Sequence, residues 1–224
     1  MHFKLNHATI LSLLLTACIA SASAEQATNK MYLKFDVGPA FISSVPISSP
    51  ANTFNYEAEF DVGIRSTVAF GYQINRNWAC ELETGVIWSS DTAFNDDFYQ
   101  IPALLNVIYR VPTGSSWTPY LGVGVGGVAT TFSTLVFQNS VIGPVNAKET
   151  NFTFAYQAGA GVEYVFSPTM TLNLGYKFLG AMEQSWSKTL YPPQVPPPNT
   201  SETYTSTADG VFSHAVLVSF TWSF

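Results

Sequence analysis

The sequence contains unusually few charged residues. Asp, Glu, Lys and Arg make up 11% of its 224 residues, whereas 47% are apolar and 15% aromatic. An average soluble domain is about one quarter charged, so this chain either buries nearly all of its surface or faces something other than water. Basic residues are the scarcer kind, with 9 Lys and Arg against 15 Asp and Glu. No basic patch can displace counterions from phosphates, and we expect no nucleic-acid partner.

Long apolar runs are also missing. Beyond residue 24 no stretch has the roughly 18 continuous apolar residues of a membrane-spanning helix. Histidine is rare, since His214 is the only one after residue 24, and the pair Asp96-Asp97 lacks the spacing of a calcium loop. The glycine-rich stretch GVGVGGV, residues 122–128, lacks the helix and the lysine of a phosphate-binding loop. We therefore expect no cofactor, no metal and no catalytic residues.

The first residues are typical of an export signal. Lys4 gives a weakly basic start, residues 10–20 are apolar but too short to span a bilayer, and Ala22-Ser23-Ala24 forms a small-residue cleavage site. This divides the chain into a signal peptide, residues 1–24, and one domain, residues 25–224. An alternative is the stretch Leu15-Thr16-Ala17-Cys18, which resembles a bacterial lipobox and would leave a lipidated Cys18.

What the remaining sequence has is alternation. In FDVGIRSTVAFGYQI, large apolar residues fill every second position and small or polar residues fill the others, as in a strand. Eight such segments occur, most of them long enough for a tilted strand that crosses a bilayer. They cover residues 31–41, 58–74, 77–89, 98–111, 117–131, 151–166, 169–184 and 211–224.

The connections between these segments alternate in length. Residues 75–77, 112–116 and 167–168 form short turns, whereas residues 42–57, 90–97, 132–150 and 185–210 form longer, more polar loops. This is the arrangement of an outer-membrane barrel, which has its short turns in the periplasm. The sequence therefore predicts an all-β fold, an eight-stranded antiparallel up-and-down transmembrane β-barrel.

Charged residues fall on one face of these strands. Well inside each segment, the face with the large apolar residues has no charge, which is what contact with lipid requires. On the glycine-rich other face we predict a lumen network in which four basic residues neutralise five acidic ones. Its members are Lys34, Asp36, Asp61, Arg65, Glu81, Glu83, Arg110, Glu163 and Lys177.

The chain ends in VLVSFTWSF, with aromatic residues at alternating positions up to Phe224. On this strand and the pattern above, the chain resembles the small eight-stranded outer-membrane barrels of Gram-negative bacteria, the OmpA transmembrane domain and OmpX type. The resemblance implies that Phe220, Trp222 and Phe224 form a signal for the outer-membrane assembly machinery. It also implies location in the outer membrane, a multi-pass barrel among lipid and lipopolysaccharide, and periplasmic chaperones as partners.

The function we expect is structural or adhesin-like, through long loops that meet host or environmental ligands. Two alternatives stay open. The first is a narrow porin-like channel, although a barrel of eight strands is only just wide enough for its own side chains. The second is an enzyme that modifies lipid A, for which only His214 is placed on the lipid face. The main structural rival is a soluble lipocalin-like barrel, which would point its large apolar residues inward.

The loops suggest two further interpretations. They are mostly acidic, so they favour a solvated rim or divalent cations that bridge to lipopolysaccharide phosphates. The proline-rich stretch YPPQVPPPNTS, residues 191–201, is expected to be an extended tip of the last loop.

Overall fold

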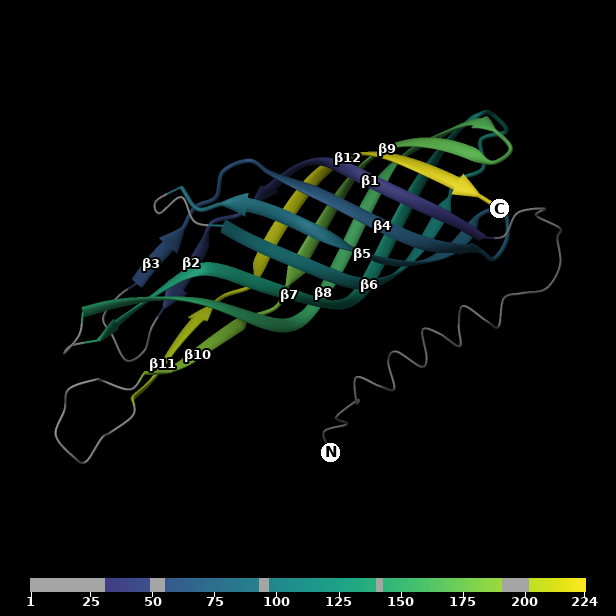
Figure 1. The fold of residues 1–224 in the computed structure, drawn as a ribbon. Coiled ribbons are helices and arrows are strands. Elements are labelled where there is room, and N and C mark those ends of the chain that lie inside the picture. Colours follow the sequence, from purple (N-terminus) through teal and green to yellow (C-terminus); the bar gives the residue numbers. More distant parts are fainter. Residues whose placement is uncertain (1–30, 49–54, 93–96, 140–142, 191–201) are drawn as a thin grey trace, which may run out of the picture.

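The computed structural model describes residues 31–48, 55–92, 97–139, 143–190 and 202–224. Eight strands close into one antiparallel barrel in the order β1-β12-β9-β8-β7-β6-β5-β4, which confirms the predicted fold (Figure 1). The barrel strands are β1 Met31–Ile42, β4 Gly63–Gln73, β5 Trp78–Ser90, β6 Asp97–Arg110, β7 Trp117–Asn139, β8 Gly143–Ser167, β9 Met170–Ala181 and β12 Val211–Ser223.

The first and last strands close the barrel. β1 pairs with β12 along a register that sets Phe35 opposite Phe220, and on its other side β1 pairs with β4. Every barrel strand thus has two hydrogen-bonded neighbours and the sheet has no free edge. Hydrocarbon demands this closure because it offers no partner for an unpaired backbone group.

The two ends of the barrel differ. At one end, here called the short-turn end, residues 74–77, 111–116 and 168–169 connect consecutive strands, and β1 begins and β12 finishes there. At the opposite end, the long-loop end, the chain folds into a second sheet in the order β10-β11-β2-β3. Its strands are β2 Val45–Ser48, β3 Asn55–Ala58, β10 Gln184–Leu190 and β11 Glu202–Ala208.

The long connections contain more regular structure than the predicted loops. Three of the four expected loops contain strands, and β7 and β8 stay paired out to Asn139 and Gly143. These parts were missed because their short polar strands show no apolar alternation. Backbone pairing beyond the membrane needs no apolar face.

The alternation also fails just before β4. Asp61 and Val62 are consecutive and both exposed, whereas strict alternation would put one inside. Both lie outside a strand, because β4 starts only at Gly63. Phe60, predicted on the same face as Val62, instead packs against the ring of Phe98 at 4.7 Å.

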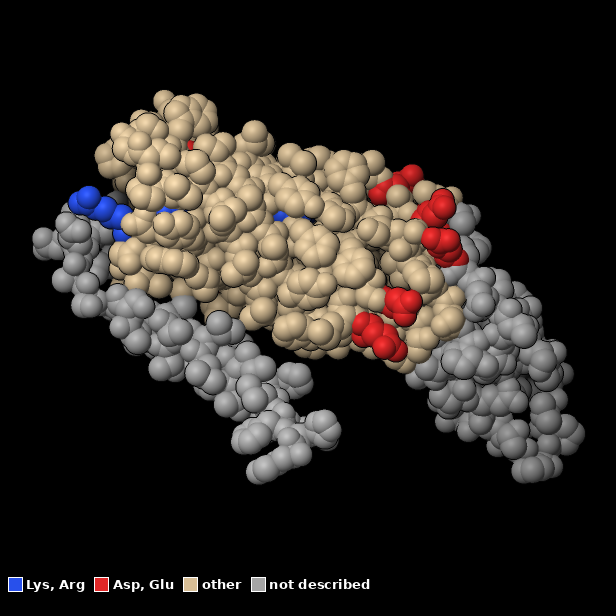
Figure 2. Space-filling view, turned by 180° about the vertical axis from the view of Figure 1, so that it is seen from behind, with Lys and Arg blue, Asp and Glu red and all other residues tan. Residues whose placement is uncertain are grey.

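The outer surface of the barrel is an apolar belt. Side chains such as Leu82, Val123 and Leu174 are 64%, 63% and 55% exposed. Among residues with described side chains, the exposed charged ones all lie at the two ends, as Figure 2 shows for one side of the molecule. Arg76 lies at the short-turn end, and six acids lie at the long-loop end: Glu57, Glu59, Asp61, Asp97, Glu183 and Asp209. The predicted separation of charge from the lipid face is thus present, and the lipocalin arrangement is excluded.

The interior has an apolar part and a polar part. Toward the long-loop end it holds a cluster of buried apolar side chains that includes Ile87, Leu104 and Leu179, each 0% exposed. Phe98 and Phe132 continue this cluster with ring centroids 4.8 Å apart. Buried charged residues occupy the middle of the barrel.

Within the described ranges no helix is long and apolar enough to cross a membrane. The predicted signal peptide, residues 1–24, and the Cys18 alternative lie outside the described residues.

Candidate functional site

A compact group of four charged side chains lies in the middle of the barrel. Lys177 Nζ is 2.5 Å from Asp36 Oδ2 and 2.9 Å from Glu83 Oε2. Arg65 Nη2 is 2.9 Å from Glu83 Oε1. Two cations and two carboxylates balance, as burial in a medium of low dielectric constant requires. The four residues come from β1, β4, β5 and β9, so the closed sheet brings them together.

Neutral polar groups complete this central group. Asn106 Nδ2 and Gln157 Nε2 donate to Glu83 Oε2 at 2.9 and 3.1 Å, and Gln157 Oε1 accepts a hydrogen bond from Arg65. Thr67 Oγ1 donates to Asp36 at 3.0 Å. The sequence prediction missed these three residues because it considered only charge. Each of the three alternates with lipid-facing neighbours in its strand, and this alternation would have predicted that its side chain points into the lumen.

A second pair lies beside it. Lys34 Nζ is 3.7 Å from Glu81 Oε1, which also accepts a hydrogen bond from Tyr32 Oη at 2.9 Å. The Lys34 ammonium lies 5.3 Å from the centre of the Tyr120 ring, within the range of a cation–π interaction. Side chains of β1, β5 and β7 thus fill this part of the lumen.

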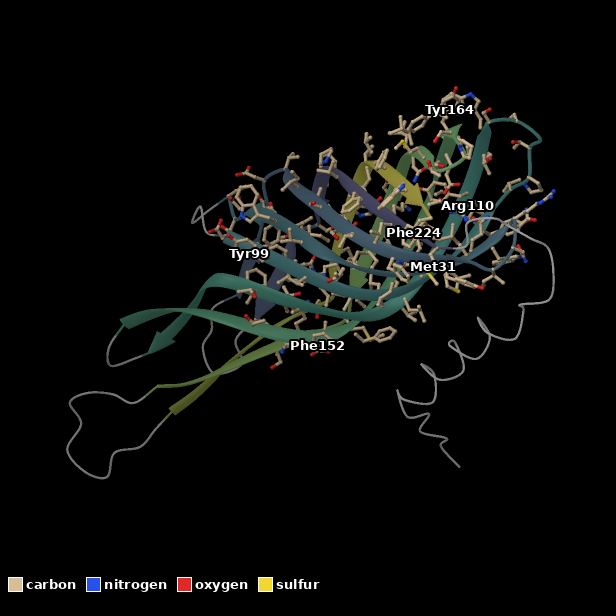
Figure 3. The ribbon with its side chains drawn as sticks, turned by 45° about the vertical axis from the view of Figure 1, so that its right-hand side comes forward. Met31, Tyr99, Arg110, Phe152, Tyr164 and Phe224 are labelled. Atoms are coloured by element: carbon tan, nitrogen blue, oxygen red, sulfur yellow. The ribbon has the colours of Figure 1, made fainter. Side chains whose placement is uncertain are left out.

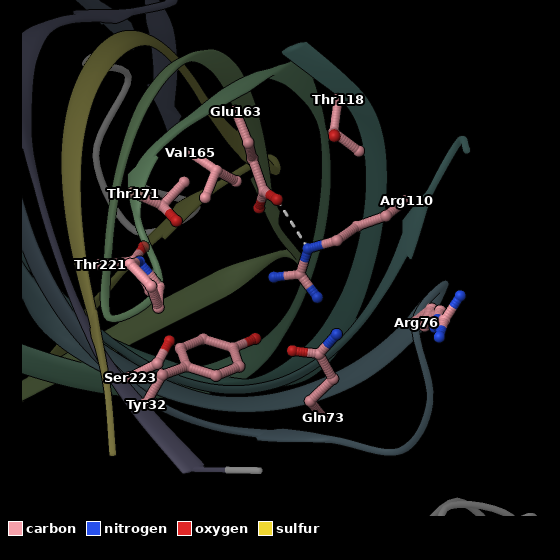
Figure 4. Close-up of a pocket in the computed structure, with 11 residues that line it drawn as sticks. Tyr32, Gln73, Arg76, Arg110, Thr118, Glu163, Val165, Thr171, Thr221 and Ser223 are labelled. Atoms are coloured by element: carbon pink, nitrogen blue, oxygen red, sulfur yellow. Dashed lines mark hydrogen bonds and ion pairs between the residues drawn. The ribbon is translucent and has the colours of Figure 1, made fainter. Parts of the chain in front are cut away.

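A third pair borders a cavity at the short-turn end. Arg110 Nε donates to Glu163 Oε2 at 2.7 Å, and the guanidinium carbon lies 5.6 Å from the centre of the Tyr32 ring. The cavity has a volume of about 400 Å³ (Figure 4). Its lining side chains are mostly polar: Tyr32, Gln73, Arg76, Arg110, Thr118, Glu163, Val165, Pro168, Thr171, Thr221 and Ser223.

Eight of the nine residues predicted for the lumen network therefore lie inside the barrel, in three groups rather than one. Asp61 was wrongly assigned to it. Its side chain is exposed at the long-loop end, because alternation was extended from Arg65 back through a segment that is not a strand. The eight that remain are four basic residues, Lys34, Arg65, Arg110 and Lys177, and four acidic ones: Asp36, Glu81, Glu83 and Glu163. A further buried acid, Asp91, follows β5 at the long-loop end.

Little space remains between these groups. A cavity of only about 10 Å³ lies among Lys34, Glu83, Asn106 and Lys177, room for about one water molecule. Beyond it, the apolar cluster of Leu104 and Leu179 fills the barrel toward the long-loop end. Among the described residues, these groups lie between the 400 Å³ cavity and the long-loop end, so the cavity is a cup at the short-turn end.

His214 lies on the lipid-facing surface in an aromatic setting. Its Nδ1 is 2.5 Å from Tyr176 Oη, and its ring centroid is 5.2 Å from that of Phe178. Ser213 beside it is buried and points inward. Among the described residues no group of three His, Cys, Asp or Glu side chains could hold a metal ion. Ser213 and His214 thus point to opposite faces of β12.

Aromatic pairs surround the short-turn end. The ring centroids of Trp78 and Tyr109 are 4.8 Å apart and those of Trp117 and Tyr164 are 4.7 Å apart, and both pairs are tilted. Trp222 and Phe224 follow with 5.5 Å between ring centroids. Figure 3 shows Tyr164, Phe224 and Met31 together at this end of the barrel. Amphipathic rings at the edge of an apolar belt are typical of a membrane–water boundary.

The sequence and the fold agree with one family. The model of the outer membrane protein beta-barrel domain matches residues 10–224. The chain belongs to this family. This outer-membrane barrel is thus placed in the outer membrane of a Gram-negative bacterium, and its short turns face the periplasm. Its long-loop end faces outward.

Several solved structures with a similar fold are outer-membrane proteins. The outer membrane protein OprG from Pseudomonas aeruginosa is 16% identical over 87% of this chain and 97% of its own, with a TM-score of 0.52. Neisserial surface protein A is 16% identical over 83% and 96%, with a TM-score of 0.46. AlkL, solved in lipid bilayers, is 15% identical over 91% and 95%, with a TM-score of 0.49. No curated protein matches the sequence significantly.

Proposed function

We propose that this protein is a non-conducting outer-membrane barrel that contacts surfaces outside the cell through its long-loop end. The observation that supports it most is the character of that end. A second four-stranded sheet and the extended β7–β8 pair project there. All six exposed charged residues with described side chains at this end are acidic.

The composition of this end favours a cationic partner. Six carboxylates attract a basic protein surface, or a surface whose anionic groups carry bound divalent cations. Ser44 Oγ donates to Glu57 at 2.7 Å and Trp88 Nε1 donates to Asp97 at 2.9 Å, so two of the carboxylates are held in place. Lipopolysaccharide, with its phosphates and divalent cations, is the neighbour we expect within the membrane. The proline-rich residues 191–201 lie outside the described residues.

The filled lumen supports the non-conducting part of the proposal. An ion would have to cross the buried central group around Glu83 and then the apolar cluster around Leu179. Both steps remove water from a charge in a medium of low dielectric constant, at a high cost in free energy. A narrow channel remains the alternative function, and planar-bilayer recordings of the purified barrel distinguish the two. We expect no stepwise conductance.

The adhesion part is tested on whole cells. The variant Glu59→Gln, Asp61→Asn, Glu183→Gln, Asp209→Asn removes four exposed carboxylates and leaves the two anchored ones. We expect cells with this variant to bind cationic beads and epithelial cells less than cells with the wild-type protein, with a difference that shrinks as salt rises. Arg76→Gln, at the opposite end, is the matched control. Equal binding by the four-site variant and the wild type would contradict the proposal.

A further inference from the structure

We propose that the periplasmic cup, the 400 Å³ cavity between Arg110 and Ser223, binds the carboxylate end of a short peptide. This goes beyond the proposed function, because the cup lies at the opposite end of the barrel from the acidic surface. The cup is within the size range of small-molecule binding sites.

Arg110 supplies the anion-binding group. Figure 4 shows the Arg110 guanidinium in the cup, with its two terminal nitrogens turned toward the middle of the labelled side chains. Arg110 Nε already donates a hydrogen bond of 2.7 Å to Glu163 Oε2. Nη1 has no hydrogen-bond partner in the protein although it is covered. The Arg110 side chain also has a hydrogen bond with Tyr32, so Nη1 is the donor left without a protein partner. A charged N–H of this kind suits a carboxylate oxygen as acceptor.

The surroundings hold Arg110 in place before any ligand arrives. Its backbone N–H donates to the carbonyl of Asn77 at 2.7 Å, and Asn77 Nδ2 donates back to the Arg110 carbonyl at 2.9 Å. The Tyr32 ring lies against its guanidinium, and Tyr32 Oη is itself fixed on Glu81. The hydrogen bonds to Asn77 and the cation–π contact with Tyr32 therefore define the position of Arg110. Such preorganisation lowers the entropy cost of binding.

The charge of the cup favours a monoanion over a dianion. A single carboxylate adds one negative charge beside the Arg110–Glu163 ion pair. A phosphate dianion would leave an excess negative charge beside the carboxylate of Glu163.

The rest of the lining suits a peptide. Thr118, Thr171, Thr221 and Ser223 offer hydroxyl groups and Gln73 an amide, which together can donate to and accept from peptide groups. Val165 and Pro168 add a small apolar surface for a short side chain. Because the cup is closed toward the membrane centre by the central charged group, the ligand can enter and leave only from the periplasm.

The test uses the full-length mature barrel in detergent micelles and N-acetyl-Ala-Ala as probe, with binding measured by calorimetry. We expect saturable binding of the acid, and binding about tenfold or more weaker for the same dipeptide with an amidated end, since the charge-assisted hydrogen bonds are lost. Inorganic phosphate should bind more weakly than the acid. Equal affinity for the acid and the amide, or tighter binding of phosphate, would overturn the proposal.

Two variants locate the site. Arg110→Gln with Glu163→Gln keeps a hydrogen-bonding neutral pair and should reduce affinity for the acid about tenfold or more, because the charge is lost. Thr171→Phe fills the cup, leaves every charge in place, and should abolish binding. Asp61→Asn, at the far end, is the control. Heat-modifiable gel mobility establishes that each variant is folded, and wild-type affinity in folded Thr171→Phe would refute the site.

Peptide carboxylates reach this side of the outer membrane from two sources. Cell-wall peptides end in D-residues, whereas fragments of degraded proteins end in L-residues. Titration of the D,D and L,L forms of the probe distinguishes the two sources. A preference for either form supports a stereospecific peptide site, and failure of both forms to bind refutes the assignment.

Discussion

The guanidinium of Arg65 and the carboxylate of Glu83 lie 2.9 Å apart in the middle of the barrel, at 1% and 0% exposure of their side chains. They come from neighbouring strands, β4 and β5, but are not directly opposite each other, because Arg65 is paired with Ile87 and Glu83 with Ala69. Their contact runs diagonally between the two adjacent strands, on the side that faces the lumen. Together with Lys177 and Asp36 they close the barrel's interior at its centre.

Arg65→Met is expected to lower the free energy of unfolding by about 3–5 kcal/mol, because it breaks a buried ion pair and leaves Glu83 with one cation shared with Asp36. The double variant Arg65→Met, Glu83→Gln leaves Lys177 and Asp36 balanced and should cost clearly less. Urea unfolding of the refolded barrel measures both. A double variant as unstable as the single one would argue against charge balance as the role of this group.

Leu179→Ala should destabilise the barrel by about 2–5 kcal/mol, because Leu179 is fully buried in the apolar cluster and its removal leaves a cavity. Leu174→Ala, in the same strand but 55% exposed toward lipid, is the matched control. Lipid acyl chains fill the space left by the shortened side chain at position 174, so no cavity forms there. Only the favourable free energy of moving the Leu side chain out of water is lost. The same unfolding experiment compares the two, and equal losses would show that the lumen cluster is not tightly packed.

Leu174→Arg places a charge in the apolar belt and should cost about 2–4 kcal/mol if this position lies near the bilayer midplane. Val111→Arg, in a periplasmic turn, should cost about 0–1 kcal/mol because the charge reaches water there. Unfolding in lipid vesicles, rather than in micelles, gives the comparison. A negligible effect at position 174 would be incompatible with lipid contact.

Gly71→Ala is expected to destabilise the barrel by about 1–3 kcal/mol through overpacking. A Cβ at this position would lie 2.0 Å from Cζ of the Tyr32 ring, which lies across the glycine. In a Tyr32→Leu background the same substitution should be nearly neutral, since the ring is gone. A double-mutant cycle from urea midpoints measures this coupling. Additive effects of the two changes would contradict it.

Phe224→Ala is predicted to reduce the amount of folded protein in the outer membrane, because the aromatic end of the last strand is the expected assembly signal. Phe35→Ala removes a similarly exposed aromatic residue, 52% against 47%, from β1 and should assemble normally. Heat-modifiable mobility in membrane fractions reports the folded fraction in cells. Equal loss in both variants would indicate a general need for lipid-facing aromatics instead of a signal.

Much of the fold could be predicted from alternation and charge. Residues such as Leu82 and Leu174 are separated from Glu83 and Lys177 by an odd number of positions, and in a strand this puts them on opposite faces. Since hydrocarbon tolerates no unpaired backbone group and little charge, the pattern defined the closed barrel and its outward face. The prediction was wrong where these constraints end, at Asp61 and in the strands β2, β3, β10 and β11.

The candidate site was predictable only in part. The inward direction of Arg110 and Glu163 follows from their positions in the sequence. Their contact, the ring of Tyr32 against the guanidinium and the cup around them depend on three-dimensional register.

By itself, therefore, the sequence determined that this chain crosses a membrane as a barrel, and which side chains face lipid. Those properties depend on the lipid hydrocarbon that surrounds the barrel and on the alternation of side chains between the two faces of a strand. Both can be judged from each strand's own sequence. The tertiary structure decided which charges pair, where the lumen is filled and where it stays open. These properties depend on the shear of the closed sheet, which brings β4, β5, β8 and β9 together across the lumen. The residue pattern within a single strand does not specify that shear.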